Sequence, residues 1–444
     1  MTMCPILTAS RAVRPHVVII GGGFGGLAAA RALKDAPVRI TLIDRRNHHL
    51  FQPLLYQVAT ATLPPGHIAA PIRGLLKEQD NVTVVLGEVT GIYAEHSTVI
   101  VALPGGGKSQ FEYDYVVVAT GAEHSYFGRE EFAHHAPGMK TLSDALTIRQ
   151  KILQVFERAE AEGPRANEGL LTFVLVGAGP TGVEIAGALA MLTRKTLKSS
   201  FRKIDPGSAR IILVDQAPRI LGAFEEELSE KARKHLEGLG VEVRLGHGIE
   251  QIDENGVVLG GERIASKTVI WTAGVAASPV GKWLKAETDR AGRVRIEKDL
   301  TVAGQQNIFV LGDTASLEQN GKPLPGVAQV AMQQGNYAGR LIRRRVAGKK
   351  DLPPFRYFDK GNMAVVAGRY AIVQSGKFKL SGLFGWLPWA AIHIAYLPLS
   401  NLRLSVLMQW VWTHVAGVRS SMLISQRSNN SEHSSGTERL KTSA

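Results

Sequence analysis

Residues 17–33 read VVIIGGGFGGLAAARAL, and this stretch decides the fold of the N-terminal part of the chain. The apolar run predicts a buried strand, the glycines predict a tight turn, and the alanine-rich continuation predicts a helix. A second strand, RITLID, follows and ends in Asp44. Gly21, Gly23 and Gly26 give the spacing G-x-G-x-x-G, with Asp44 at about the separation that a dinucleotide fold requires. The segment predicts a Rossmann-like dinucleotide site, with a purely structural βαβ turn as the alternative.

Each glycine has its own role in such a turn. The first makes the turn tight, the second lets the backbone approach a pyrophosphate, and the third lets the helix pack closely on the strand. The N-terminus of the helix favours anionic phosphates. The carboxylate of Asp44 would accept hydrogen bonds from the ribose hydroxyls of the adenosine half.

The same pattern occurs a second time. Residues 172–190 read TFVLVGAGPTGVEIAGALA, and a later strand, IILVD, ends in Asp215. Downstream of each copy a strand ends in small residues, VVVATGA at 116–122 and VIWTAGVA at 269–276. A duplicated nucleotide-binding unit is the simplest explanation. The sequence therefore predicts an α/β protein with two Rossmann-like dinucleotide-binding domains.

The second copy has Gly177, Gly179 and Gly182 in the same spacing, with Glu184 two residues further along the helix. Asp215 lies 38 residues after Gly177, because a polar and basic stretch lengthens the helix and loop between them. A carboxylate at this strand end favours NADH over NADPH, whose 2′-phosphate it would repel. Acidic residues also occur in a first helical turn without any ligand, which is the alternative reading of Glu184.

Length and composition limit the possibilities. With 444 residues, 45% apolar and 20% charged, the chain has the size of two or three globular domains. Its single cysteine, Cys4, excludes a disulfide framework and cysteine-based metal sites, and no other metal site is predicted. The formal net charge of +13 suits anionic partners of several kinds and does not choose among them. The N-terminal residues lack the apolar region of a secretory signal.

With these motifs in hand, the chain resembles the flavoproteins that have two dinucleotide-binding domains and, within them, type II NADH dehydrogenase, the single-subunit NADH:quinone oxidoreductase. The resemblance covers about residues 15–425. Its more specific segments are DRRNHHLFQPLLYQVATATL (44–63), VLVGAGPTGVEIAGAL (174–189), VIWTAGVAASP (269–279), VLGDTA (310–315) and AQVAMQQG (328–335). The resemblance implies non-covalent FAD at the first fingerprint and NADH at the second. It also implies transfer of a hydride from NADH to FAD and of two electrons to a membrane quinone, without proton pumping.

The resemblance also implies the site residues. For FAD they are Gly21, Gly23, Phe24, Gly25, Gly26, Asp44, Arg45, Gln52, Val89, Thr120, Gly121, Asp313 and Gln329. For NADH they are Gly177, Gly179, Pro180, Thr181, Gly182, Glu184, Asp215, Ala273 and Gly274. The implied catalytic residues are Glu184, which would orient the nicotinamide, and Gln329, Gln333 and Lys360 near the quinone. On the residues alone, Asp313 is also compatible with an ordinary turn, the two glutamines with helix N-terminal hydrogen bonding, and Lys360 with a surface lysine.

The predicted domains follow from these assignments. They are an FAD-binding domain in two parts (14–142 and 301–354), an NADH-binding domain (143–300), a C-terminal membrane-associating region (355–424) and a disordered tail (425–444). Residues 143–162 and 326–346 are predicted to be helices.

The lack of cysteines reduces the number of possible electron acceptors. Disulfide reductases, flavin-linked peroxidases and sulfide:quinone reductases all use active-site cysteines, whereas the stretch after Asp44 has Arg, Asn and His where a redox cysteine would sit. The remaining acceptors are a quinone, a protein carrier such as ferredoxin, or oxygen. A soluble NADH-dependent carrier-protein reductase and a flavin- and NADH-binding redox sensor are the alternative functions.

The C-terminal part has a distinct composition. Residues 380–402 contain no Asp, Glu, Lys or Arg, and residues 403–423 are apolar and aromatic with an arginine near each end. Four of the six tryptophans lie here, namely Trp386, Trp389, Trp410 and Trp412. Because tryptophan is enriched at membrane–water interfaces, we expect a C-terminal membrane-anchoring region with its tryptophans at that interface.

Pro388 and Pro398 favour short segments that lie in the interface. A transmembrane helix over 380–402 is one alternative, and a core or dimerisation surface is another. The predicted partners are a membrane quinone and the bilayer surface, with a homodimer as an option and no nucleic acid. The predicted location is the cytoplasmic side of the cell membrane, with peripheral (monotopic) attachment.

Overall fold

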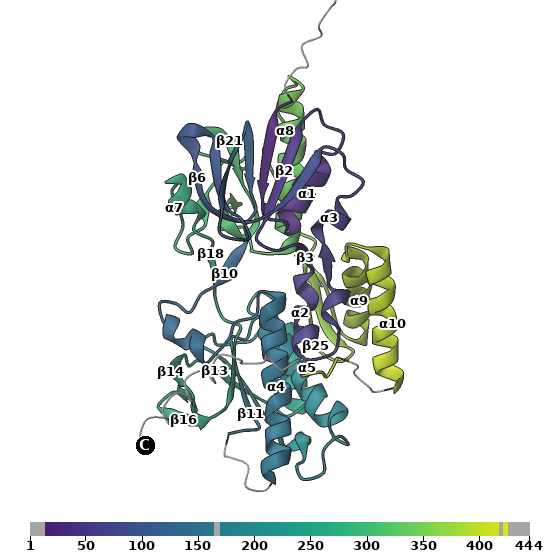
Figure 1. Cartoon of the computed structure of the whole chain (residues 1–444). Coiled ribbons are helices and arrows are strands. Elements are labelled where there is room, and N and C mark those ends of the chain that lie inside the picture. Colours follow the sequence, from purple (N-terminus) through teal and green to yellow (C-terminus); the bar gives the residue numbers. More distant parts are fainter. Residues whose placement is uncertain (1–13, 164–168, 417–420, 425–444) are drawn as a thin grey trace, which may run out of the picture.

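The computed structural model of the chain describes residues 14–163, 169–416 and 421–424. It consists of two α/β units, one above the other in Figure 1, with the C-terminal elements packed on one flank. Cys4 and the predicted tail at 425–444 lie outside the described residues.

The first unit is built on a six-stranded sheet with the order β20-β21-β9-β1-β2-β5. Its strands are β1 (His16–Ile20), β2 (Arg39–Asp44), β5 (Val82–Leu86), β9 (Tyr115–Val118), β20 (Thr301–Val302) and β21 (Gln305–Val310). All are parallel to their neighbours except β20. Helix α1 (Phe24–Ala32) follows β1, and α8 (Ala328–Val346) packs along it. Because β21 and α8 come from late in the chain, this unit is discontinuous.

The second unit repeats this plan. Its parallel sheet has the order β13-β12-β11-β17. The strands are β11 (Thr172–Val176), β12 (Arg210–Asp215), β13 (Val241–Leu245) and β17 (Thr268–Trp271), and the helices are α4 (Leu142–Glu162), α5 (Pro180–Met191) and α6 (Glu226–Gly238). Helix α5 continues into a π-helical turn, Leu192–Thr196, before a loop leads to β12. This is the lengthened connection predicted for the second copy.

The repeat extends beyond the glycine turns. In each unit a three-stranded antiparallel sheet stands before the strand that ends in small residues. The strands are β6 (Glu88–Tyr93), β7 (Thr98–Ala102) and β8 (Lys108–Glu112) in the first unit, and β14 (Ile249–Asp253), β15 (Gly256–Leu259) and β16 (Glu262–Ala265) in the second.

Two short antiparallel strands connect the units. Strand β10 (Ala122–His124) leads from the first unit to the second, and β18 (Val275–Ala277) leads back. After β18, helix α7 (Val280–Leu284) and Val294 join the apolar core that contains β1 residues. The domain boundary predicted at residue 300 therefore differs from the packing, because the chain has already returned to the first unit.

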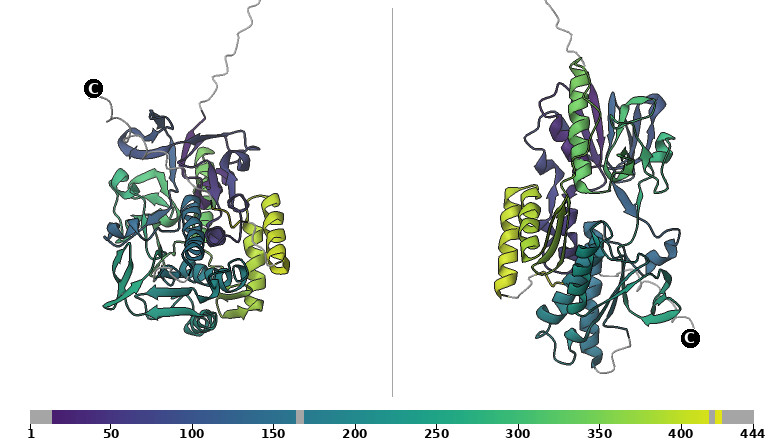
Figure 2. Two further views of the ribbon diagram at one scale, coloured as in Figure 1. Left: turned by 60° about the horizontal axis from the view of Figure 1, so that its bottom comes forward. Right: turned by 180° about the vertical axis from the view of Figure 1, so that it is seen from behind.

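The C-terminal region begins with a three-stranded antiparallel sheet and ends in two helices. These elements are β25 (Asn362–Ala367), β26 (Tyr370–Ser375), β27 (Phe378–Gly382), α9 (Leu383–Tyr396) and α10 (Ser400–Ala416). Smaller elements elsewhere are β3 (His48–Leu50), α2 (Leu55–Ala59), β4 (Ala69–Pro71), α3 (Ile72–Leu75), β19 (Val294–Arg295), β22 (Ala315–Ser316), β23 (Glu318–Gln319) and β24 (Lys322–Pro323). Figure 2 shows from two further sides that α9 and α10 stay together on one flank.

The alternative of a transmembrane helix over 380–402 is wrong. The polypeptide forms β27, the 14-residue α9 and the start of α10 over this range, and Pro398 lies in the turn between the helices. In the part of the chain that the structure describes, no helix has both the length and the apolar character needed to cross a bilayer. Pro388 does not end α9, although it removes one backbone donor from it.

The tryptophans are placed differently from the prediction. Trp389 and Trp410 are 1% and 7% exposed and stack on each other with ring centroids 5.5 Å apart. Trp386 packs against the same core, and Trp410 Nε1 donates to Gln57 Oε1 of α2 at 2.8 Å. Only Trp412 is largely exposed, at 60%. Three of the four rings therefore fix the C-terminal helices to the body of the protein. Their large apolar area stabilises the protein more when it is buried in that core than when it lies at a surface.

This difference can be tested with a matched pair of variants. We expect Trp389→Ala to lower the free energy of unfolding by about 3–5 kcal/mol, because it leaves a cavity. Trp412→Ala should change it by less than about 0.5 kcal/mol, because that ring is exposed. Chemical denaturation followed by circular dichroism measures both, and equal losses for the two variants would contradict the burial of Trp389 and the exposure of Trp412.

Candidate functional site

The first glycine loop is closed on its inner side and open on its outer side. Gly21 has φ +102°, and a Cβ there would lie 2.3 Å from the carbonyl oxygen of Ala119. A Cβ on Gly26 would lie 1.8 Å from the carbonyl oxygen of Gly21, so the helix can approach the loop only without a side chain. A Cβ on Gly23 would meet nothing within 4 Å. The loop thus has free space at the position where a pyrophosphate approaches the backbone.

The second glycine loop has the same geometry. Gly177 has φ +107°, and a Cβ there would lie 2.6 Å from the backbone nitrogen of Ala273. A Cβ on Gly182 would lie 1.8 Å from the carbonyl oxygen of Gly177, and a Cβ on Gly179 would meet nothing within 4 Å. The structure therefore contains two dinucleotide cradles of matching shape.

A carboxylate stands beside each cradle. Asp44 Oδ2 accepts a hydrogen bond from the backbone nitrogen of Gly22 at 2.6 Å, and Asp215 Oδ2 accepts one from that of Ala178 at 2.5 Å. The other oxygen of each accepts from the backbone nitrogen two residues further on. Both carboxylates are half-buried and fixed at a strand end next to the loop, where the adenosine ribose of a dinucleotide would lie.

Three hydroxyl groups meet at the end of β9. Thr120 Oγ1 lies 2.6 Å from Ser278 Oγ and 3.1 Å from Thr314 Oγ1, and Thr314 donates to the carbonyl oxygen of Gly121. Ser278 and Thr314 are buried. The sequence predicts Thr120 and Gly121 but not their two partners. Ser278 follows β18, the strand that returns from the second unit. Only its place in the second copy of the repeated pattern, just after VIWTAGVA, could have indicated a role for it.

Asp313 lies just beyond β21, in the short helical turn Gly312–Thr314, and Lys140 faces it. Lys140 Nζ is 3.9 Å from Asp313 Oδ2, and the carbonyl oxygen of Lys140 accepts a hydrogen bond from Gln52 Nε2 at 2.9 Å. The backbone nitrogen of Gly312 donates to Oε1 of Gln334, a buried residue that is 1% exposed. The structure therefore brings the predicted residues Gln52 and Asp313 together through Lys140, which sequence reasoning missed.

The segment that includes Gln52 also packs on the first glycine loop. The ring centroids of Phe24 and His49 are 5.0 Å apart, those of Phe24 and Phe51 are 6.0 Å apart, and His49 Nδ1 lies 3.1 Å from the carbonyl oxygen of Gly22. Burial lowers the pKa of His49 to about 4, so the imidazole is neutral at physiological pH. A neutral aromatic wall therefore adjoins the loop.

The remaining predicted cofactor residues lie around the two loops. Gly25 packs on α8, Arg45 forms an exposed ion pair with Glu123 at 3.0 Å, and Val89 is buried in β6. Pro180 and Thr181 open α5, while Ala273 and Gly274 follow β17.

Glu184 lies in the first turns of α5, under β25. Part of the residue reaches solvent, yet burial raises the pKa of its carboxyl well above the usual range, although a hydrogen bond from the backbone N–H of Val365 lowers it. The surroundings that raise this pKa favour the neutral carboxyl, whereas a helix dipole stabilises the charged one. This argues against the alternative in which Glu184 serves the dipole alone.

Two of the predicted quinone residues, Gln329 and Gln333, lie on α8, and the third, Lys360, lies in the segment before β25. Gln333 uses both ends of its amide on the backbone of Phe358, at 3.0 Å each, so it ties the segment that carries Lys360 to α8. Gln329 lies one turn earlier on α8 and is half-buried. Lys360 Nζ donates to the hydroxyl of Tyr396 at 3.0 Å. Tyr396 ends α9 and was missed by sequence reasoning, because nothing in its local sequence indicates this long-range pair.

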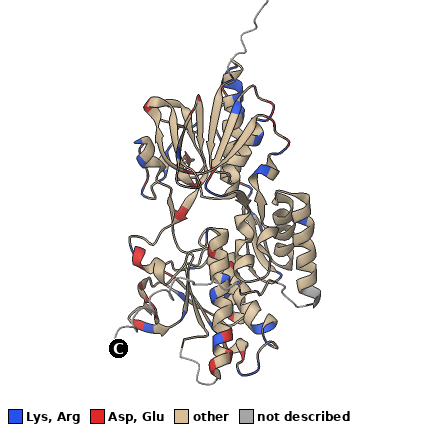
Figure 3. Ribbon diagram, in the orientation of Figure 1, with Lys and Arg blue, Asp and Glu red and all other residues tan. Residues whose placement is uncertain are grey.

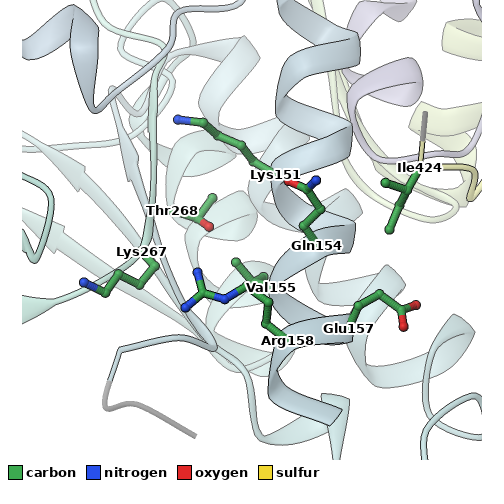
Figure 4. A pocket seen from close by; sticks show the side chains of 8 residues that line it. All are labelled: Lys151, Gln154, Val155, Glu157, Arg158, Lys267, Thr268 and Ile424. Atoms are coloured by element: carbon green, nitrogen blue, oxygen red, sulfur yellow. The ribbon is translucent and has the colours of Figure 1, made fainter. Parts of the chain in front are cut away.

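A separate cavity of about 830 Å³ lies beside α4, next to the start of β17 (Figure 4). It is lined by Lys151, Gln154, Val155, Glu157, Arg158, Lys267, Thr268 and Ile424. Lys267 donates to the carbonyl oxygen of Glu254 and to Asn255 Oδ1, and Arg158 is 3.7 Å from Glu162. Two of its three cations thus have partners within the protein, and none of the predicted site residues lines it.

The chain is similar to several known proteins over most of its length. A model of the pyridine nucleotide-disulphide oxidoreductase family matches residues 15–335. The chain is 44% identical to the type II NADH:quinone oxidoreductase Ndh of Mycobacterium tuberculosis over 432 residues, which cover 95% of this chain and 92% of the relative. It is 46% identical to NdhA of the same organism over 428 residues, 93% of this chain and 90% of the relative. Among solved structures, NDH2 from Plasmodium falciparum in complex with NADH has a TM-score of 0.84 and 20% identity, over 91% of this chain and 99% of that one. This last match shows the shared fold.

The raised pKa of Glu184 has a consequence for stability. The unfolded carboxyl releases its proton near pH 4.5 and the folded one at a higher pH, so wild-type stability falls as pH rises between these two values. Each unit of difference costs about 1.4 kcal/mol. We expect Glu184→Gln, which resembles the neutral acid, to lack this fall when melting temperatures are measured from pH 5 to 9. Replacing the exposed Glu226 by Gln is the control, and parallel curves for all three proteins would refute the assignment.

Proposed function

The chain belongs to the type II NADH:quinone oxidoreductases, within the pyridine nucleotide-disulphide oxidoreductase family, and we propose that it oxidises NADH and reduces a membrane quinone with bound FAD. The observation that carries this proposal is the identity of 44% and 46% to two such enzymes over nearly the whole chain. The two matching cradles supply the physical basis, because the reaction needs one nucleotide as a resident group and another as a substrate.

The residues at the first cradle fit FAD. The free space at Gly23 and the N-terminus of α1 suit its pyrophosphate, and Asp44 suits its adenosine ribose. Asp313 and Lys140 lie on the other side of β1, towards β21, where the flavin half would extend. Bound FAD supplies the redox chemistry, since a flavin accepts a hydride and releases electrons singly or in pairs.

The second cradle is assigned to NADH. Gly179 and the N-terminus of α5 would hold its pyrophosphate, and Asp215 would bind its adenosine ribose. The carboxylate of Asp215 disfavours NADPH because it would repel the 2′-phosphate. Glu184 would orient the nicotinamide. Burial raises the pKa of this carboxyl and so favours its neutral form, which both donates and accepts hydrogen bonds and is complementary to the carboxamide of that ring.

Gln329 and Lys360 are proposed to lie beside the quinone. Reduction of a quinone places charge on its oxygens before protons arrive, and the ammonium of Lys360 would stabilise that charge. The Tyr396 hydroxyl fixes the ammonium at 3.0 Å and connects it to the C-terminal end of α9. Gln333 acts indirectly in this proposal, since it holds the segment that carries Lys360.

We place the membrane contact on the outer faces of α9 and α10. Arg403 is their only Asp, Glu, Lys or Arg residue, and Figure 3 shows the two helices almost free of charged residues. The exposed apolar side chains of α10 recur at helical spacing. They are Leu404, Leu407, Met408, Val411 and Trp412, with Leu383, Phe384, Leu387 and Ile392 on α9. Such a face suits helices that lie in the bilayer interface, from the cytoplasmic side, where a quinone dissolved in the membrane is within reach.

The reaction is tested with purified FAD-loaded protein. We expect NADH to be oxidised faster with a short-chain quinone than with ferredoxin or with oxygen. Faster reduction of ferredoxin would favour a carrier-protein reductase, and slow turnover with every acceptor would favour a redox sensor. Either result would overturn the proposal.

The membrane contact is tested separately. The double variant Met408→Glu with Trp412→Glu should bind lipid vesicles at least about tenfold more weakly, because two exposed apolar side chains no longer enter the bilayer. Co-sedimentation with vesicles measures this. Tyr93→Glu, at a side chain that is also largely exposed, is the matched control on the first unit. Unchanged sedimentation of the double variant would place the membrane contact elsewhere.

A further inference from the structure

Phe127 has two unusual properties for an aromatic residue. Its side chain is 69% exposed, and its backbone has φ +56°. A bulky residue in this left-handed region is strained, and such strain persists where the surroundings hold the residue in place. The chain here therefore keeps an apolar ring at the surface in a conformation that it would otherwise avoid.

The ring lies against the second cradle. A Cβ on Gly274 would lie 2.5 Å from Cζ of Phe127, so the ring is in contact with this glycine. The loop is fixed at the end of β17, because Trp271 Nε1 donates to the carbonyl oxygen of Ser125 at 2.9 Å and the backbone nitrogen of Ser125 approaches the carbonyl oxygen of Gly274 at 3.4 Å.

The duplication provides an internal comparison. Gly121 and Gly274 have φ +72° and +73°, and each is followed by one of the two paired strands β10 and β18. Counting onward from these glycines, Phe127 corresponds to Val280. Val280 is fully buried in the core of the first unit. At the same position the second cradle has an exposed aromatic ring, so core packing does not account for it.

The strand order indicates which half of the nucleotide would meet this ring. In the sheet β13-β12-β11-β17, the strands β12 and β17 flank β11 on opposite sides. A dinucleotide whose pyrophosphate lies on the loop after β11 and whose adenosine ribose reaches Asp215 after β12 must extend its other half towards β17. Gly274 and Phe127 lie there.

We propose that Phe127 is a binding residue for the nicotinamide half of NADH, forming an apolar side wall over Gly274 that becomes buried when the nucleotide enters. This inference rests on the proposed assignment of the second cradle to NADH. Burial of the exposed ring against the nucleotide favours binding through the hydrophobic effect and aromatic contact. The strained backbone fixes the ring beforehand, which lowers the entropic cost of ordering it on binding.

The test removes the ring in two ways. Phe127→Ala and Phe127→Gly should each raise the dissociation constant of NAD⁺ for the oxidised FAD-loaded protein about tenfold, as measured by calorimetry. The KM for NADH should rise in parallel, while kcat with a short-chain quinone stays near the wild-type value. Glycine accepts positive φ without strain, so Phe127→Gly should melt no lower than Phe127→Ala. If both variants also melt well above the assay temperature, a shared loss of affinity is not caused by unfolding.

Phe378→Ala is the matched control. Phe378 is 60% exposed on β27, and its replacement should leave NAD⁺ affinity unchanged. If both Phe127 variants bind NAD⁺ as the wild type does, the inference is wrong even though the wild type oxidises NADH. If the wild type neither binds NAD⁺ nor oxidises NADH, the proposed function itself is wrong.

Discussion

The contact on which both nucleotide sites depend is the approach of a helix to the turn that precedes it. At Gly26 and at Gly182 a Cβ would lie 1.8 Å from a carbonyl oxygen, so any side chain there would force the helix away from the strand. The close approach places the first N–H groups of α1 and α5 directly above the end of a parallel strand. It also fixes the loop against the neighbouring strand, where Asp44 and Asp215 bond to its backbone.

The duplicated units use this shared geometry differently because β10 and β18, the paired strands that connect the units, lead to different residues at each cradle. Strand β18 carries Ser278 back to the hydroxyl group of Thr120, where it closes the inner wall of the first cradle. Strand β10 leads to Ser125 and Phe127 at the second cradle, where the wall stays exposed. A site that keeps its cofactor gains from closed, buried walls, whereas a site that exchanges a substrate needs one that the substrate can cover. The asymmetry therefore matches a resident nucleotide in the first unit and an exchanging one in the second.

The sequence predicted those features that depend on neighbours along the chain. Glycine spacing, apolar strands and terminal carboxylates are local, so both glycine loops and the lengthened α5 connection were predictable, whereas the two-part first unit was implied only by the family resemblance. Lys140 and Tyr396 were not predictable, because their partners lie far away in the sequence and their own surroundings carry no pattern, and Ser278 could have been found only from its place in the duplication. The tryptophans show a different limit. A tryptophan-rich composition is compatible with both a protein core and a membrane–water interface. Only the packing shows that Trp389 and Trp410 are buried while Trp412 is exposed.

The C-terminal region also packs on α5, the helix of the second cradle. A Cβ on Gly187 of α5 would lie 1.7 Å from the carbonyl oxygen of Val366, so β25 packs directly on this helix. The same strand provides the N–H of Val365 to Glu184 and buries its carboxyl, which raises the pKa. Helix α9 follows this sheet at β27, and it ends at Tyr396, the partner of Lys360. One short sheet thus packs on the helix that carries Glu184 and leads directly into the helices proposed to meet the membrane.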